Sequence, residues 1–399
     1  MTVDIKKYSK FLDNVAEDID ISPSKYQDAV DRYKAVGRWL EQGEYTKCSG
    51  ELSIYPQGSF RLGTVVRPIR DGVEASYDID LVCELPIEKV QTTPQAIKST
   101  VGDRIKEHGT YRKLLDDEGK RCWTLEYVEE DDVGFHLDVL PAVPDPSSLL
   151  DTSIAITNKA ETTYSWSASN PKGYGVWFDG KNQAAFEFAL SEQKQSIQAR
   201  APDIYVRLDD VPDQLVRTPL QRSIQLMKRH RDVKFNHEQV NGYSPISIII
   251  TTLSAHFYQN ELDTFTALRN IVEKLHAHTA LVEGRPVDAS IAAISPIKRT
   301  QDGKWYIGNP VNSDENFADR WHEDNHARAK AFFSWVTALK EDLINIIQET
   351  RPNIIRKNIS TALGAAIVSG HLDIIAPVKA AVVDAPKIHI SGAAKPWRA

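Results

Sequence analysis

Residues 77–84 read YDIDLVCE, two aspartates set two positions apart in an otherwise apolar run. Side chains of a β-strand alternate between its two faces, so Asp78 and Asp80 leave the same face, about two rises of 3.3 Å apart. Aspartates are rarely fully buried unless they are paired or bind a metal ion. The pattern therefore predicts a strand that presents two neighbouring carboxylates on one side.

A third carboxylate lies in a second apolar run, FHLDVL at residues 135–140. The alternation there turns Asp138 to one face of another strand. Divalent cations with oxygen ligands, about 3.5 to 4 Å apart, can hold both the attacking and the leaving oxygen of an in-line phosphoryl displacement. We expect Asp78, Asp80 and Asp138 to hold two Mg²⁺ ions, with Mn²⁺ as an alternative. His136 shares this strand, and we expect it to support a metal ligand or to pack, rather than to bind metal itself.

The segment QGSFRLGT at residues 57–64 follows a predicted strand around Ile54 and opens a predicted short helix. Backbone N–H groups at a helix start bind phosphate, and Gly58 lets a triphosphate approach the main chain closely. Ser59 is then expected to hold the β- and γ-phosphates. The simpler alternative is an ordinary capping turn.

In combination, Gly58-Ser59, Asp78-x-Asp80 and Asp138 resemble the DNA polymerase β-like nucleotidyltransferase superfamily. The blocks YPQGSFRLGTVVRP, YDIDLVCEL and FHLDVLPAVP resemble the bacterial cGAS/DncV-like nucleotidyltransferases of the SMODS type, the CD-NTases. These enzymes make cyclic oligonucleotide second messengers in anti-phage signalling. The later blocks IQLMKRHRDVKF and SPISIIITTLSAHFY resemble the family's C-terminal lobe, so the similarity covers most of the chain.

The resemblance implies that a lysine of the helix predicted from Pro219 to Asp232 reaches the donor triphosphate. Lys228 is the candidate, with Arg231 a weaker one on the same helix face, three residues further along. A run of basic residues such as KRHR at 228–231 is otherwise a solvated helix face.

A further helix is predicted from Ser244-Pro245 to Tyr258, because serine before proline is a strong helix-start signal. Its N-terminus offers an anion site if it faces the cleft. Ser244 or Ser247 could then contact phosphate, although simple capping is the alternative for Ser244.

Several properties of the chain exclude other classes. The 399 residues carry a net charge of −7, which is unlike a protein with a long nucleic-acid template. Cys48, Cys83 and Cys122 are odd in number and widely spaced, so we expect reduced thiols and neither a disulfide nor a zinc site. Some animal relatives grip DNA through a zinc-binding insert, and the sequence has no matching cluster. No transmembrane run or signal peptide is indicated, so the cytosol is expected.

The fold class expected is α/β, a bilobed polymerase β-like nucleotidyltransferase with a mixed-sheet core, an N-terminal spine helix and a helical C-terminal lobe. The spine helix is predicted from Ser22-Pro23 to Gln42, and a catalytic core over residues 1–217. Residues 218–385 are predicted to form the helical lobe. Residues 145–175, rich in serine, threonine and asparagine, are predicted as a loop beside the active site.

Further elements are placed by pattern. Strands are predicted at Glu51–Tyr55, Tyr77–Glu84, Arg121–Val128 and Gly134–Leu140, and helices at Thr93–His108, Glu323–Glu349 and Ile354–Ser369.

The predicted function is the condensation of nucleoside triphosphates into a cyclic di- or trinucleotide with release of pyrophosphate, read by a downstream effector. One alternative is an RNA- or tRNA-directed nucleotidyltransferase, and another is a nucleotide-binding protein without turnover. Residues 386–399 are predicted to be a flexible tail. By resemblance, its small last residue, Ala399, could be conjugated by an E1/E2-like transferase.

Overall fold

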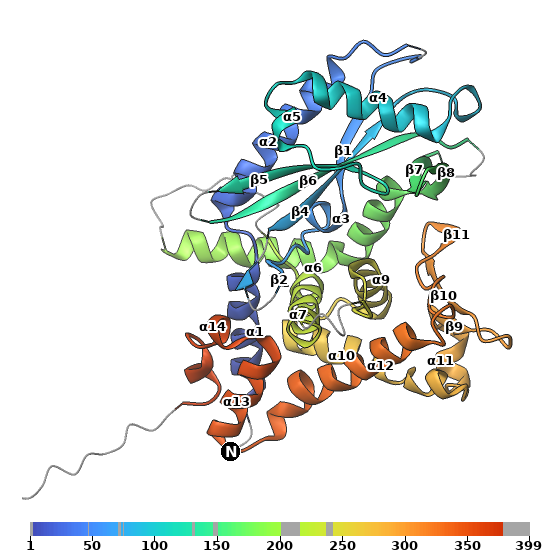
Figure 1. The fold of residues 1–399 in the computed structure, drawn as a ribbon. Coiled ribbons are helices and arrows are strands. Elements are labelled where there is room, and N and C mark those ends of the chain that lie inside the picture. The colour runs from blue at the N-terminus through green and yellow to red at the C-terminus, as the bar shows by residue number, and fades with distance from the viewer. Residues whose placement is uncertain are drawn as a thin grey trace, which may run out of the picture.

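The computed structural model describes residues 3–46, 48–70, 73–74, 76–129, 132–146, 151–200, 216–236 and 242–377. Figure 1 shows two halves, a mixed sheet covered by helices and a largely helical half, with the long helix α6 (Pro171–Arg200) running between them. The bilobed α/β class predicted from the sequence is confirmed. Domain boundaries at residues 217 and 385 stay predictions, and both lie next to or within stretches outside the described residues.

The central sheet, as far as the described ranges show it, has six strands in the order β1-β4-β6-β7-β8, with β5 paired to β6. β4 and β6 are parallel, and the other pairs are antiparallel. The strands are β1 (Ser53–Gln57), β4 (Tyr77–Glu84), β5 (Trp123–Glu129), β6 (Asp132–Pro144), β7 (Ile154–Ala160) and β8 (Thr163–Ser169). The four predicted strands are therefore present.

Alternation along β4 separates the two faces of this sheet. Ile79 and Leu81 are fully buried beneath α2 (Pro23–Glu41) and α4 (Pro94–Glu107), in a core shared with those helices. Asp78 and Asp80 leave the opposite face. That second face has only a small apolar cluster, which includes Val82. The sheet is thus apolar towards its helices and polar towards the other half of the molecule.

The N-terminal helices connect the two halves. α1 (Ile5–Ile19) packs on the helical half, whereas α2 packs on the sheet, and the chain turns between them at Asp20. Ser22 accepts a hydrogen bond from the Lys25 N–H and caps α2 where the sequence predicts. The sequence analysis did not predict α1. Its buried residues nevertheless recur at helical spacing, as Tyr8, Phe11, Leu12, Val15 and Ile19.

The helical half has a large core around α7 (Pro219–Lys234), which Thr218 and Gln221 begin with a capping box. Its other main helices are α9 (Ser247–Phe257), α10 (Thr264–His276), α12 (Ala327–Leu339) and α13 (Pro352–Leu363). The shorter helices are α3 (Gly58–Arg61), α5 (Tyr111–Leu114), α11 (Ala289–Ile294), α14 (Ala365–Val368), η1 (Lys89–Gln91), η4 (Thr279–Glu283), η5 (Lys340–Ile344), η6 (Asn345–Gln348) and η7 (Leu372–Ile374).

Two further sheets are small. β2 (Ile69–Arg70) pairs with β3 (Val73–Glu74), and β10 (Trp305–Asn309) lies between β9 (Ile297–Arg299) and β11 (Asn312–Asn316). The prediction of an entirely helical C-terminal region is therefore wrong at residues 297–316. Trp305 and Ile307 are buried while Tyr306 faces outwards, the period of two that defines a strand.

Two other predictions need correction. Residues 154–169 form the β7–β8 hairpin rather than a loop. The first four residues of β7, Ile154 to Thr157, are all buried, and β7 pairs with β8 along its whole length despite the polar composition. The single helix predicted at Glu323–Glu349 starts later, at Ala327, and loses α-helical geometry at Lys340, where a π-helical turn follows. Across the described residues, no helix is both long and apolar enough to span a membrane.

Candidate functional site

The parallel pairing of β4 with β6 places the three aspartates on one face of the sheet. Asp80 lies directly beside Asp138, and Asp78 lies beside His136. Asp78 and Asp80 lie in the first half of β4, and Asp138 lies at the middle of β6. Strand alternation predicted that Asp78 and Asp80 share a face, and the two-metal interpretation added Asp138 from a neighbouring strand.

The carboxylates of Asp138 and Asp78 each contact another side chain. The Thr124 hydroxyl donates a hydrogen bond of 2.6 Å to Asp138 Oδ1. His136 Nδ1 lies 3.2 Å from Asp78 Oδ1, so this histidine contacts one of the three aspartates, which agrees with the supporting role expected from the sequence. The contact fits a residue that orients a carboxylate.

The electrostatics of the cluster favour cations. Burial, together with the charges of Asp138 and Asp78, raises the pKa of Asp80 to about 7, while the charge of Lys228 opposes the shift. Burial also raises the pKa of Asp138, against the hydrogen bonds from Thr124 and Cys122. Carboxylates that repel one another in this way are stabilised in their charged form by a bound positive ion.

The donor set suits hard divalent ions, since it consists of carboxylate oxygens on one face. Among the described residues, no group of three or more such side chains is already arranged to hold a metal ion. The Asp138 side chain turns towards Thr124, and the Asp78 side chain turns towards His136. Both side chains would therefore have to rotate to bind the same metal ion. The backbone of the two paired strands therefore brings the three aspartates close together, but their side chains do not form a metal site in advance.

The Gly58 turn lies against the same cluster. Gly58 has a φ of +63°, and a Cβ on it would stand 2.2 Å from Asp80 Oδ2. β1 ends at Gln57, opposite Asp80, and α3 begins at Gly58, as the sequence predicts. Ser59 lies on α3 and is half-buried. The turn thus presents main-chain N–H groups next to the carboxylates.

Lys228 is behind this turn and not at the surface of the cleft. It is 2% exposed, and its ammonium donates to the Thr64 carbonyl at 2.9 Å and lies 3.3 Å from the Thr64 hydroxyl. Burial lowers the pKa of Lys228 to about 7, and the charge of Asp80 opposes this shift. Lys228 therefore supports the segment that follows Gly58 and Ser59.

The helix predicted to begin at Ser244-Pro245 begins later, at Ser247, with Ile246 as its N-cap residue. The Arg231 guanidinium donates to the Pro245 carbonyl at 3.1 Å and to the Ser247 hydroxyl at 3.0 Å. This contact holds the segment extended against α7, and proline also disfavours helical geometry at Ser244. The structure thus joins Arg231 to Ser247, and neither Ser244 nor Ser247 lines the cleft described next.

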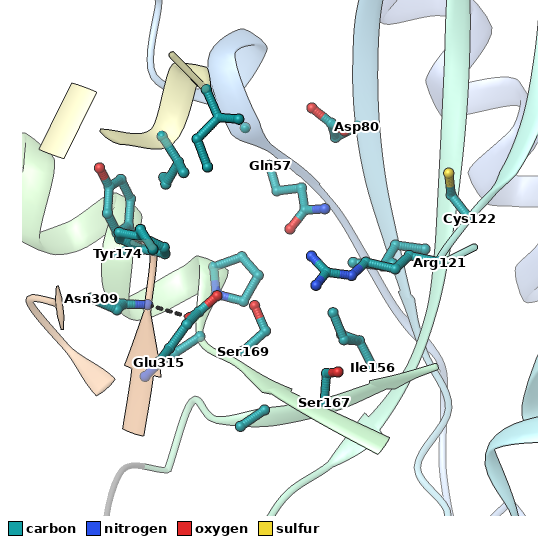
Figure 2. A pocket seen from close by; sticks show the side chains of 18 of the residues that line it. Gln57, Asp80, Arg121, Cys122, Ile156, Ser167, Ser169, Tyr174, Asn309 and Glu315 are labelled. Atoms are coloured by element: carbon teal, nitrogen blue, oxygen red, sulfur yellow. Dashed lines mark hydrogen bonds between the residues drawn. The ribbon is translucent and has the colours of Figure 1, made fainter. Parts of the chain in front are cut away.

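A cleft of about 720 Å³ opens between the sheet and the helical half. Gly58, Asp80 and Asp138 line one end of it, while Ser59, Asp78 and Lys228 do not. Figure 2 shows Asp80, Arg121 and Gln57 on one side and Asn309 and Glu315 on the other. Small-molecule sites commonly have volumes of about 300 to 1,000 Å³, so the cleft can hold a nucleotide.

Sequence analysis missed much of this lining, namely Gln57, Arg61, Arg121, Ser167, Ser169, Asn309 and Glu315. Gln57 and Arg61 flank the predicted Gly58-Ser59 turn, so their position could have been anticipated. The turn signal Gly308-Asn309-Pro310 after an alternating apolar run also predicts a hairpin. Its approach to the sheet depends on the tertiary fold.

Comparison with known proteins identifies the family of this chain. The model of the Second Messenger Oligonucleotide or Dinucleotide Synthetase domain matches residues 4–182. A c-di-GMP synthase from Roseivirga ehrenbergii is 30% identical over 83% of this chain and 77% of that protein. The cyclic dinucleotide synthase CdnG from Bradyrhizobium diazoefficiens is 25% identical over 78% of this chain and 70% of that protein.

A solved structure of the Bradyrhizobium diazoefficiens CD-NTase CdnG in complex with GTP has the same fold. It matches with a TM-score of 0.67 and 20% identity, over 92% of this chain and 98% of that chain. The chain therefore belongs to the bacterial CD-NTases of the polymerase β-like superfamily. It is a nucleotidyltransferase and cyclic oligonucleotide synthase, in a family that depends on metal ions.

Proposed function

We propose that this chain condenses two nucleoside triphosphates, at least one of them GTP, into a cyclic dinucleotide and releases pyrophosphate. The observation that supports this most is the meeting of Gly58, Asp80 and Asp138 at one end of a nucleotide-sized cleft. The named relatives make c-di-GMP and cyclic dinucleotides, and one solved neighbour contains GTP.

The proposed roles follow from position. Main-chain N–H groups of the Gly58 turn, with the Ser59 hydroxyl, bind the β- and γ-phosphates of the donor. Lys228 keeps this turn in place through Thr64 rather than touching the triphosphate itself. Arg231 holds Ser247 and thereby the start of α9. Ser244 and Ser247 therefore contribute to the cleft by positioning this helix and not by contacting the nucleotide.

Asp78, Asp80 and Asp138 are proposed to hold two Mg²⁺ ions, or Mn²⁺ in their place. Bound there, such ions neutralise phosphate charge and lower the pKa of the acceptor hydroxyl. The chain's own residues align donor and acceptor, and positioning of this kind accounts for much of the rate gain in phosphoryl transfer. The contacts of His136 with Asp78 and of Thr124 with Asp138 would be exchanged for metal contacts when the ions bind.

Product analysis tests the proposal. Purified protein is incubated with all four nucleoside triphosphates and Mg²⁺ or Mn²⁺, treated with phosphatase, and its products are identified by mass spectrometry. A phosphatase-resistant cyclic dinucleotide containing guanine is expected. Label that enters only added RNA would instead indicate an RNA-directed nucleotidyltransferase. Nucleotide binding without any product would contradict the proposed synthesis.

The biological setting proposed is anti-phage signalling, with a downstream effector that binds the cyclic product. Activation by a DNA template is not expected of so acidic a chain. Conjugation of Ala399 by an E1/E2-like transferase stays a prediction, because that residue lies outside the described residues.

A further inference from the structure

The end of the cleft opposite the aspartates has a built polar surface of its own. Asn309 ends β10, is 7% exposed, and accepts a hydrogen bond from the Val311 N–H at 3.0 Å. Its amide donates to Glu315 Oε2 at 2.8 Å. Two hydrogen bonds therefore fix Asn309, and Asn309 in turn fixes the Glu315 carboxylate at the cavity wall (Figure 2).

Arg121 comes from the opposite wall, two residues before β5. Figure 2 shows its guanidinium inside the cavity, between Gln57 and Ser169. No hydrogen bond or ion pair found among the described residues uses the guanidinium. Its charge nevertheless acts on Glu315, where burial raises the pKa of the carboxyl and Arg121 opposes the rise. A carboxylate and an unpaired guanidinium thus face the same space.

The charge of the Glu315 wall decides which part of a nucleotide can lie against it. Asp314 and Asp319 line the same side of the cleft, so a triphosphate is repelled there. At the other end the triphosphate meets the main-chain N–H groups of the Gly58 turn, and the carboxylates there, Asp80 and Asp138, are those proposed to hold Mg²⁺. Because a nucleotide that enters the cleft has its phosphates at one end, its base is the part directed towards Glu315.

We propose that Glu315 and Arg121 select guanine as the base bound in this cleft, a residue assignment that rests on the synthase function proposed above. Guanine presents two adjacent donors, N1–H and the 2-amino group, that match the two oxygens of one carboxylate. Its O6 and N7 are acceptors that an arginine fork binds in pairs. Adenine offers one donor beside the N1 lone pair, which Glu315 would repel.

Binding of nucleoside diphosphates tests this selection without turnover. Titration calorimetry with Mg²⁺ compares GDP with inosine 5′-diphosphate, which lacks only the 2-amino group, and with ADP. Loss of one hydrogen bond to a charged acceptor corresponds to a weakening of about ten-fold or more. The parent is therefore expected to prefer GDP over inosine diphosphate by about ten-fold. Equal affinities in the parent would overturn the assignment before any variant is made.

Two substitutions test the contributions of Glu315 and Arg121 separately. Glu315→Gln keeps the size of the residue but removes one acceptor, so the preference for GDP over inosine diphosphate is expected to fall towards one. Arg121→Met is expected to weaken both ligands equally, because both retain O6 and N7, while the preference for GDP over ADP falls. An unchanged GDP to inosine diphosphate ratio in Glu315→Gln would refute the role of Glu315.

The control is Glu323→Gln, a change of the same chemistry at a surface carboxylate that pairs with Arg320 and does not line the cleft. It is expected to keep the parent's preference. The outcomes also separate this inference from the proposed function. Guanine selection without any cyclic product would contradict the synthase proposal alone, whereas a cyclic product with no base preference traceable to Glu315 or Arg121 would contradict only the selection.

Discussion

Gly58 and Asp80 are in such close contact that residue 58 has no room for a side chain. A Cβ there would lie 2.2 Å from Asp80 Oδ2 and 3.1 Å from its Cγ, and the φ of +63° disfavours any other L-residue. The Gly58 turn, which we propose binds phosphate, and the central carboxylate are therefore fitted to each other. Movement of either one displaces the other.

Gly58→Ala is expected to lower activity about a hundred-fold, because misplacement of a reacting group by about 1 Å can cost that much. It should also reduce the free energy of unfolding by about 1 to 2 kcal/mol through the left-handed backbone. The control is Gly180→Ala on α6, where a Cβ meets nothing within 4 Å. There alanine should stabilise the helix by up to about 1 kcal/mol. Product yield and urea unfolding measure both effects.

Asp78→Asn combined with Asp80→Asn is expected to abolish synthesis while the protein stays folded. Removal of two mutually repelling carboxylates should raise the melting temperature of the protein in EDTA. It should also remove the stabilisation that added Mg²⁺ gives the parent. Normal turnover by the double variant would refute the assignment of these aspartates as metal ligands.

Ser59→Ala is expected to weaken the use of nucleoside triphosphates about ten-fold, since one hydrogen bond to a charged phosphate is lost. The effect should appear in kcat/KM and not in the unfolding free energy, because Ser59 is half-buried on a short helix. If the kinetics of Ser59→Ala equal those of the parent, Ser59 does not bind phosphate and Gly58-Ser59 is only a structural turn. A serine far from the cleft, Ser369→Ala, serves as the control.

Lys228→Met tests a pH-dependent contribution to stability. The pKa of Lys228 is lowered to about 7 by burial, whereas an unfolded lysine holds its proton to about pH 10.4. Between these values the unfolded chain binds the extra proton, so this group makes the free energy of unfolding rise with pH. Lys228→Met should remove the part of this pH dependence that is due to Lys228, which corresponds to at most one proton. Urea unfolding at pH 7 and pH 9.5 measures the difference.

The matched control is Lys234→Met, at an exposed lysine on the last turn of the same helix. It should leave the pH slope unchanged. Because Thr64 loses its buried donor in Lys228→Met, the variant should also use triphosphates less well than the control does. Identical slopes in the two variants would show that the buried ammonium does not titrate as its surroundings indicate.

The sequence predicted those features that depend on short-range periodicity. Asp78 and Asp80 share a face because a strand repeats every second residue, and Gly58 marks a turn that only glycine accommodates. Ser244-Pro245 was misread as a helix start because the contact of Arg231 with the Pro245 carbonyl comes from another helix. Local propensity carries no information about such a partner.

The far end of the cleft was beyond prediction for the same reason. Arg121 and Glu315 are 194 positions apart in the sequence, the difference between their residue numbers, and they face one cavity only because β11 lies against β8. The β7–β8 hairpin was predicted as a loop because its serine, threonine and asparagine residues are typical of loops, although the first four residues of β7 are buried. Polar composition is a poor guide where one strand face lines a polar cleft.

α6 determines how the cleft can move. Lys172 at its start donates to Ser53 Oγ at 3.0 Å and pairs with Glu84 at 3.2 Å, and so is tied to the sheet. Tyr174, two residues later, shares a 2.8 Å hydrogen bond with Thr252 of α9. The first turn of α6 thus joins the sheet to α9, across the cleft. A hinge opening at this point would have to break these hydrogen bonds. The width of the cleft at this end is therefore set by one helical turn, through the hydrogen bonds of Lys172 and Tyr174.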